Sequence, residues 1–280
     1  MTAPTIGSLR VNGATLYYEV RGRGPLVLLI PGGTGGAASF DGIADELAAE
    51  CTVATYDPRG MSRSTLDDPD AEQQVAEHAD DAFRMLELLS PGRPARVFGS
   101  GSGAIAALHL LTAHPERIAR VVAHEPPVVE VLPDAAEHRA LIAHVQDTLH
   151  TQGLMPAMAV FAEGLNKDGD TTEPKSALKL PPPAAARAER TMANLPYFVG
   201  RIVPSFMSYT PDVRRLEELS DRLVITGGQD SRGELPYCSA AFLAERLRTE
   251  LLHFPGGHIG LTTHSTEFGE LLRKTLRDSI

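Results

Sequence analysis

The chain has 280 residues, enough for one moderately large domain or for one core that carries an inserted segment. Hydrophobic residues make up 42% and charged residues 22% of the chain, which argues against disorder over most of its length. A formal net charge of −10 argues against nucleic-acid binding, because contact with a phosphate backbone needs clustered lysine and arginine.

No segment of the sequence has the pattern of a membrane span or a leader. The longest uninterrupted aliphatic run, Leu26–Ile30, is far too short to cross a bilayer. Residues 1–10 contain no basic segment followed by an apolar core, so we expect no signal peptide and a cytoplasmic protein without a membrane partner. The two cysteines have no metal-type spacing.

The first third of the chain alternates short strands with helices. Strands are expected at 15–20, 26–30, 53–56, 95–98 and 121–123, and helices at 37–50, 70–89 and 104–113. The run Leu26–Ile30 is wholly apolar, which is typical of a parallel strand buried on both faces. This alternation predicts an α/β fold with a mostly parallel, twisted sheet flanked by helices.

The alternation stops after Pro126-Pro127. The next ninety or so residues contain no convincing strand; helical patterns occur at 135–152, 155–165 and 184–194, and an exposed-loop pattern at 166–183. Helical insertions in α/β cores usually cover the ligand site. We therefore expect a helical cap at residues 127–215 and a core formed by residues 1–126 and 216–280, where strand and helix patterns resume.

Five small residues, Gly99-Ser100-Gly101-Ser102-Gly103, stand between a predicted strand and a predicted helix. This segment resembles the nucleophile elbow of the α/β-hydrolase-fold superfamily, whose pattern is Gly-x-Ser-x-Gly. The flanking glycines match Gly99 and Gly103, and Gly101 occupies the position of the serine. The resemblance implies a serine esterase or lactonase fold in which the attacking side chain is absent.

Two nearby serines offer other registers for this turn. Ser100 lies two positions after Phe98, where a tight turn needs a small residue. Ser102 is sterically possible, but it would move the turn into the helix. The segment Ala113–Ile118 resembles the helix-ending “HPERV” element of the family, and counting back from it places the centre of the turn at Gly101, with Ser102 as the main alternative.

Later segments resemble the acid and the base of the family, in the chain order nucleophile, acid, base. A strand leads through two glycines to Asp230, which matches the acid, and Glu125, just after an earlier strand, is the alternative. His258 lies in a glycine-rich turn after a short strand and matches the base. The resemblance thus implies a triad of Gly101, Asp230 and His258.

The loop Pro31-Gly32-Gly33 occupies the place of the “HG” oxyanion loop of the family. The resemblance implies that the N–H groups of Gly33 and Ser102 form the oxyanion hole, with Thr34 as a further candidate. Pro31 stands where many relatives have a histidine that braces this loop, which leaves the geometry of the loop open.

The segment Tyr56–Ser64 resembles the D-x-R-G-x-G-x-S segment of the family. We interpret it as structural, with Asp57 and Arg59 pairing or capping. The resemblance as a whole covers roughly residues 6–126 and 216–276 and leaves out the predicted cap.

The cap offers apolar side chains for a small hydrophobic substrate or ligand, although each could equally pack the cap onto the core. They are Phe161, Leu165, Tyr197, Phe198, Phe206, Met207 and Tyr209. The predicted substrate-binding residues are Thr34, Ser100, Glu125, Tyr197 and Phe198. No phosphate loop follows a strand and no metal cluster is visible in the sequence, so we expect no cofactor. The sequence does not distinguish a monomer from a homodimer.

Gly101, whether natural or introduced, leaves three hypotheses for function. In the first hypothesis, the chain is a serine hydrolase that lacks its nucleophile. Alternatively, it uses His258 as a general base for elimination, proton transfer or cyclisation without a covalent intermediate. In the third hypothesis it is a pseudoenzyme that binds a ligand without turnover.

Overall fold

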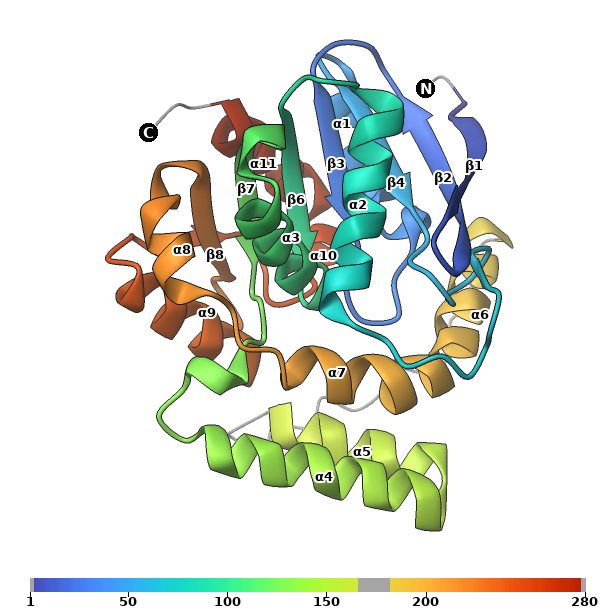
Figure 1. Ribbon diagram of the computed structural model, residues 1–280, viewed down its shortest axis with the longest axis vertical. Coiled ribbons are helices and arrows are strands. Elements are labelled where there is room, and N and C mark those ends of the chain that lie inside the picture. The colour runs from blue at the N-terminus through green and yellow to red at the C-terminus, as the bar shows by residue number, and fades with distance from the viewer. Residues whose placement is uncertain (1–2, 166–181, 278–280) are drawn as a thin grey trace.

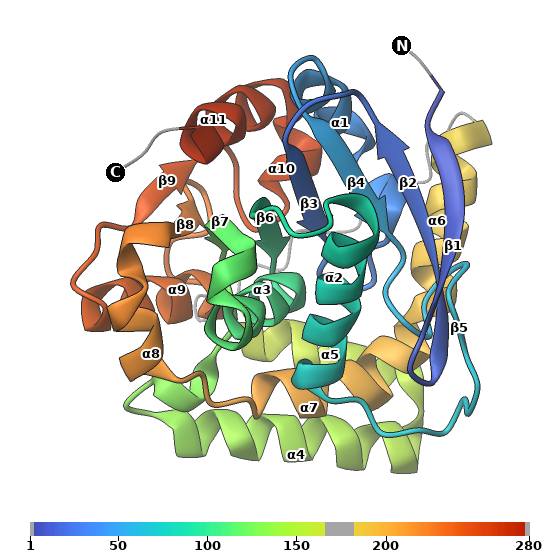
Figure 2. The same cartoon turned by 45° about the horizontal axis from the view of Figure 1, so that its top comes forward.

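A nine-stranded, mostly parallel sheet forms the centre of the fold, in the order β1-β2-β4-β3-β6-β7-β8-β9 with β5 paired to β2 (Figure 1, Figure 2). The computed structural model describes residues 3–165 and 182–277. The strands are β1 (Thr5–Val11), β2 (Ala14–Arg21), β3 (Leu26–Ile30), β4 (Thr52–Tyr56), β5 (Thr65–Leu66), β6 (Ala95–Ser100), β7 (Ile118–His124), β8 (Leu223–Gly228) and β9 (Leu252–Phe254). The pairs that involve β2 are antiparallel, and the pairs from β4 to β9 are parallel.

Helices cover both faces of this sheet. They are α1 (Asp41–Ala48), α2 (Val75–Leu89), α3 (Ser102–Ala113), α8 (Val213–Glu218), α9 (Leu235–Arg246), α10 (Gly260–Thr263) and α11 (Ser265–Arg277). In β3, Leu28 belongs to the apolar cluster that contains residues of α2, α3 and α9, whereas Val27 and Leu29 belong to the cluster that contains residues of α1 and α11. Successive side chains of a strand point to opposite faces, so a strand covered on both faces needs an uninterrupted apolar run.

Between β7 and α8 the described chain is helical. The helices are α4 (Ala135–Gln152), α5 (Leu154–Leu165), α6 (Pro182–Tyr197) and α7 (Val203–Met207), with one turn of π-helix at Phe198–Ile202. In Figure 1, α4 and α5 lie at one end of the molecule, beyond α7. A separate apolar cluster, which includes Val145, Phe161 and Val199 and extends to Leu235 of α9, holds α4, α5 and the π-turn together.

The prediction of helices without strands in this region is confirmed for its described residues. Residues 166–181 of the predicted loop lie outside the described residues, and the boundaries at 127 and 215 stay a prediction. No helix in the described ranges is long and apolar enough to cross a membrane.

The first strand, β1, was not expected from the sequence. It pairs with β2 along its whole length, and Val11 and Ala14 close the hairpin around Asn12-Gly13. Gly13 has a φ of 72°, the left-handed conformation that a tight hairpin turn requires. The Asn-Gly pair is a strong hairpin signal, so this strand was predictable from its turn even though its exposed residues hide its periodicity.

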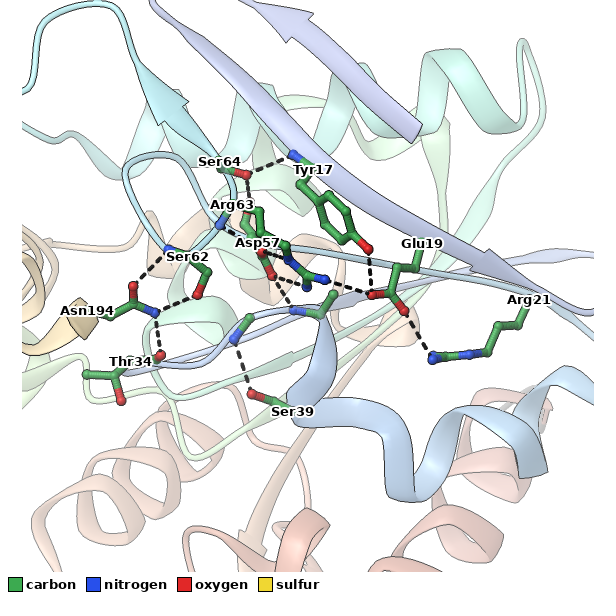
Figure 3. A network of polar contacts seen from close by, with 12 residues as sticks. Tyr17, Glu19, Arg21, Thr34, Ser39, Asp57, Ser62, Arg63, Ser64 and Asn194 are labelled. Carbon is green, nitrogen blue, oxygen red and sulfur yellow. Dashed lines mark hydrogen bonds and ion pairs between the residues drawn. The ribbon is translucent and has the colours of Figure 1, made fainter. Parts of the chain in front are cut away.

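Asp57 and Arg59 do not pair with each other, which corrects that part of the prediction. Arg59 donates two hydrogen bonds of 2.7 Å to the buried carboxylate of Asp81 in α2. Asp57 accepts hydrogen bonds from Arg63 Nε at 2.7 Å and from the Ala37 N–H at 2.8 Å (Figure 3). Ala37 begins a 3₁₀ turn before α1, so Asp57 does have a capping contact. Arg59 instead satisfies a carboxylate that would otherwise be buried without a partner.

Candidate active site

The carboxyl ends of five parallel strands meet at one edge of the sheet, and the loops that leave them form the candidate site. In strand order β3, β6, β7, β8 and β9, the residues that follow these strands and contribute to the site are Gly33, Gly101, Glu125, Ser231 and His258. In open α/β sheets, ligands bind at this edge.

Three glycines allow the turn after β6 to pack closely against the loop after β3. A Cβ on Gly99 would overlap backbone atoms of Gly103, and a Cβ on Gly103 would overlap the carbonyl oxygens at the end of β3. A Cβ on Gly32 would overlap the carbonyl oxygen of Ser100. A side chain at Gly32 or Gly103 would push the two loops apart, and one at Gly99 would push the end of β6 away from the start of α3.

Gly101 differs from these three, because a side chain there would have space. It forms the turn between β6 and α3 with φ 54° and ψ −121°, and its N–H donates to the His124 carbonyl oxygen at 2.9 Å. A Cβ on Gly101 would lie 3.4 Å from His258 Nε2, with no closer neighbour. Neither Ser100 nor Ser102 has a positive φ. The side-chain direction at residue 101 therefore points at the imidazole.

The imidazole of His258 is held by a buried carboxylate. His258 Nδ1 lies 2.7 Å from Glu125 Oε2, and the Glu125 side chain is fully buried. The other oxygen, Oε1, accepts the Gly228 N–H at 2.7 Å and the hydroxyl of Ser231. Burial alone would raise the pKa of Glu125, but the hydrogen bond and the charge of His258 outweigh it and lower the pKa below its ordinary value.

The carboxylate on His258 is thus Glu125, where Asp230 was the first expectation from the sequence. Asp230 is exposed, whereas the next residue, Ser231, is fully buried and contacts Glu125. The bend after β8 thus presents Ser231 to the interior and Asp230 to the solvent. Glu125 itself has a φ of 47°, a conformation that is rare for a residue with a side chain.

A second histidine lies behind His258. His124 is fully buried at the end of β7, its Nδ1 lies 3.0 Å from Thr226 Oγ1, and its ring stacks near that of His258 with centroids 6.4 Å apart. Burial lowers the pKa of His124 to about 4. His124 is therefore neutral near pH 7 and adds no charge behind the imidazole of His258.

The two oxyanion donors expected from the sequence lie next to each other, but one is already engaged. The Gly33 N–H donates to Ser102 Oγ at 3.1 Å. Ser102 is the first residue of α3, where N–H groups have no partner within the helix. A hydroxyl that accepts one hydrogen bond can still donate its own. A ligand oxygen at this place would have to displace the Ser102 hydroxyl from Gly33 or accept a hydrogen bond from it.

Two cavities meet at the imidazole, and both are lined in part by Gly33, Thr34 and His258. The apolar cavity, of about 240 Å³, lies under the cap and is lined mainly by Met158, Phe161, Leu165, Leu195, Phe198 and Phe206. The loop-side cavity, of about 250 Å³, is lined among others by Ser39, Ser100, Thr191, Ile259, Leu261 and Thr262.

Three of the predicted substrate-binding residues, Thr34, Ser100 and Phe198, line these cavities, and their role in binding stays a prediction. Glu125 does not reach either cavity, because it is buried behind His258. Tyr197 lines neither cavity, and its ring lies against Gly60. Tyr197 is the last residue of α6, and Phe198, which does line the apolar cavity, is the first residue of the π-turn.

Comparison with known proteins agrees with this architecture. The sequence profile of the alpha/beta hydrolase fold matches residues 25–146. The uncharacterized hydrolase YraK of Bacillus subtilis (strain 168) is 36% identical over 277 residues, which cover 96% of this chain and 95% of YraK. The chain belongs to the alpha/beta hydrolase family. Zearalenone hydrolase of Bionectria ochroleuca is 38% identical over 119 residues, 41% of this chain and 45% of that enzyme. The enol-lactonase of Burkholderia xenovorans LB400 shares the fold, with a TM-score of 0.73 and 16% identity over 97% of this chain and 100% of the lactonase.

Sequence reasoning missed two residues that organise the site of this α/β hydrolase. Ser231 orients Glu125, and only its place one residue after Asp230 could have suggested it. Asn194 in α6 contacts the loop that contains Thr34, and no pattern in the cap pointed to it.

Proposed function

We propose that this α/β hydrolase is built to hydrolyse carboxylic esters or lactones of small apolar molecules, and that Gly101 stands at the position of its absent nucleophile. One observation carries the proposal: His258 is held at Nδ1 by Glu125 at 2.7 Å while its Nε2 lies 3.4 Å from the place of a Cβ on residue 101. A serine Oγ extends one bond beyond that Cβ, within hydrogen-bonding reach of Nε2. This geometry supports the roles of Glu125 as the acid, His258 as the base and residue 101 as the nucleophile position.

With a serine at residue 101, His258 would take the hydroxyl proton as the oxygen attacked the carbonyl carbon. The oxyanion would form near the N–H groups of Gly33 and Ser102, and His258 would then pass its proton to the leaving alkoxide. Glu125 would hold the ring in the tautomer that leaves Nε2 free to accept a proton.

For ester hydrolysis with glycine at residue 101, His258 would have to activate a water molecule placed in the space over Gly101. The resulting hydroxide would attack the carbonyl carbon directly, and no acyl-enzyme would form. Loss of the nucleophile from a triad lowers turnover about 10⁶-fold, while binding and the oxyanion hole still provide about 10³-fold over water. We therefore expect slow hydrolysis without a burst from the chain as it stands.

The two cavities support a substrate with a group on each side of the reacting carbonyl. At about 30 Å³ for each water-sized group, a cavity of about 240 Å³ holds about eight such groups, and the loop-side cavity of about 250 Å³ holds a similar number. The apolar cavity favours a hydrocarbon or aromatic portion. The loop-side cavity, with Ser39, Thr191 and Thr262, also suits a portion that carries hydroxyl or carbonyl groups. The names of two related proteins, a zearalenone hydrolase and an enol-lactonase, support hydrolysis of small molecules.

The test is hydrolysis of p-nitrophenyl esters with short and medium acyl chains by the chain itself, by Gly101→Ser and by Gly101→Ala. Gly101→Ser should release a burst of nitrophenol close to the enzyme concentration and turn over at least about 10³-fold faster than the other two. Gly101→Ala is the matched control, since it adds a side chain without a nucleophile. A folded Gly101→Ser variant that neither bursts nor turns over would refute ester hydrolysis by this site.

A second candidate is proton abstraction without a covalent intermediate, as in elimination or cyclisation. It is favoured by the complete pair of His258 and Glu125, which can act as a general base without any nucleophile. In that case His258→Ala abolishes a reaction of the chain with glycine still at residue 101. A pure binding role predicts the opposite, that ligand affinity survives His258→Ala.

A further inference from the structure

The cap helix α6 lies between the two cavities and contributes to both. Leu195 lines the apolar cavity and Thr191 lines the loop-side cavity. Asn194, on the same helix, is buried, with only 4% of its surface exposed. A buried amide usually has all its polar atoms hydrogen-bonded, and its partners show what it holds in place.

The partners of Asn194 belong to two loops of the core. Its Oδ1 accepts the Ser62 N–H at 2.8 Å, and its Nδ2 donates to the Ser62 hydroxyl and to the Thr34 carbonyl oxygen, each at 2.9 Å. Figure 3 shows the amide of Asn194 between Ser62 and Thr34, where it bridges the two loops. Ser62 has a φ of 52°, so Asn194 binds a segment whose backbone conformation is rare for a residue with a side chain.

The loop that Asn194 contacts has little stiffness of its own, because residues 33, 35 and 36 are glycines. The far end of this loop is fixed by Asp57, which accepts the Ala37 N–H at 2.8 Å. Asp57 also accepts the N–H of Arg63, the neighbour of Ser62, at 3.1 Å. Asp57 therefore braces both loops from the core, and Asn194 braces both from the cap.

We infer that Asn194 is a positioning residue that holds the oxyanion loop in place from the cap. Thr34, whose carbonyl oxygen it binds, directly follows Gly33, the proposed oxyanion donor. Loss of one oxyanion donor lowers turnover about 10²–10³-fold, so a loop that is free to shift should lose part of that factor. This inference rests on the proposed function, since it assigns Asn194 to the oxyanion hole of the same site.

The sharpest variant is Asn194→Asp, which has nearly the same shape and keeps the acceptor for the Ser62 N–H. It replaces the donor to Thr34 with an oxygen that repels the carbonyl. The matched control is Gln146→Glu, the same amide-to-carboxylate change at another cap residue. Gln146 Nε2 donates to the Val199 carbonyl oxygen at 2.8 Å, within the cap and away from the oxyanion loop.

Two measurements test the inference. Amide hydrogen exchange, followed by NMR in the chain with Gly101 unchanged, should become at least about ten-fold faster at Gly35 and Ala37 in Asn194→Asp and stay unchanged in Gln146→Glu. In the Gly101→Ser background, Asn194→Asp should lower kcat for p-nitrophenyl esters about 10–100-fold with KM within about three-fold, and Gln146→Glu should change neither. If Asn194 only stabilised the fold, Asn194→Asp would raise amide exchange rates throughout the protein and would not lower kcat selectively at a nearly constant KM.

Each outcome decides the matter. Unchanged exchange at Gly35 and Ala37 in Asn194→Asp overturns the inference, whatever the activity. Faster loop exchange with an unchanged kcat in an active Gly101→Ser background also overturns it, because the loop would then not need Asn194 for catalysis. If Gly101→Ser is inactive, the proposed function fails, and the exchange measurement alone still decides whether Asn194 holds the loop.

Discussion

A side chain on Gly101 should destabilise the fold through backbone strain and not through overlap. The residue has φ 54° and ψ −121°, and a Cβ there would meet His258 Nε2 at an ordinary contact distance of 3.4 Å. Glycine adopts such angles freely, whereas a residue with a side chain in this conformation costs the folded state about 1–3 kcal/mol of backbone strain. We therefore expect Gly101→Ala to lower the free energy of unfolding by that amount. The loss of unfolding free energy in Gly101→Ser should be about 1 kcal/mol smaller than in Gly101→Ala, because the serine hydroxyl can donate a hydrogen bond to His258.

The expected change in melting temperature follows from the size of the chain. At about 2.1 cal/mol/K of unfolding entropy per residue, 280 residues give about 0.6 kcal/mol/K. A loss of about 1–3 kcal/mol then lowers Tm by about 2–5 °C. Differential scanning calorimetry resolves such a change, and urea unfolding at 25 °C provides an independent value.

Gly13→Ala is the control for this experiment. Gly13 also has a positive φ, 72°, and a Cβ there would have no neighbour within 4 Å. Its substitution reports the penalty for the backbone angle alone, about 1–2 kcal/mol. If Gly13→Ala lowers Tm and neither substitution at Gly101 does, the strained turn is not at residue 101 and the reasoning fails.

Three further predictions concern the groups around this turn. In the Gly101→Ser background, Glu125→Gln should lower kcat about 10³–10⁴-fold, because an amide cannot hold the imidazole in the required tautomer, and Asp230→Asn should stay within two-fold; steady-state ester hydrolysis compares them, and a larger loss in Asp230→Asn would reverse the assignment. In the same background, Ser102→Ala should raise kcat/KM about five-fold, since it removes a competing hydrogen bond of about 1 kcal/mol from the oxyanion loop; a ten-fold fall would instead identify the hydroxyl as a donor to the substrate. The pKa of His124 in the folded chain, about 4, lies below its ordinary value of 6.5. As the pH falls, the unfolded chain therefore takes up the proton first, and the free energy of unfolding decreases between about pH 6.5 and pH 4. His124→Gln should remove about 3 kcal/mol of this pH dependence, as measured by urea unfolding at pH 7 and pH 4, and an unchanged dependence would contradict a buried neutral ring.

The elements whose apolar residues recur with a clear helical or strand spacing were predictable from the sequence, and their ends were set by local chemistry. Helix α4 (Ala135–Gln152) has the predicted bounds. Helix α2 starts at Val75, later than the predicted residue 70, because charged residues before it gave a helical composition without helical contacts. Local periodicity fixes what a segment is, but it carries less information on where the segment begins.

The site was predictable only as far as its residues follow strands. His258 and Glu125 both follow strands, and a chain-order argument could find each of them. It could not choose between Glu125 and Asp230, because that choice depends on which way the turn after β8 faces. Asn194 lies beyond the reach of such arguments, since its contacts with Ser62 and Thr34 join residues more than 130 positions apart along the chain.

The glycines around the turn bear on the proposed absence of a nucleophile at residue 101. Gly32, Gly99 and Gly103 are required by close backbone contacts, so a change at any of them disturbs the packing of β3, β6 and α3. Gly101 has no such contact, and glycine relieves the strain that a serine would impose there. We therefore expect a glycine in place of serine at this position to remove an attacking oxygen and also to stabilise the fold. Under the proposed function, a stable fold does not by itself require a serine at residue 101, and the hydrogen bond between His258 and Glu125 forms without one.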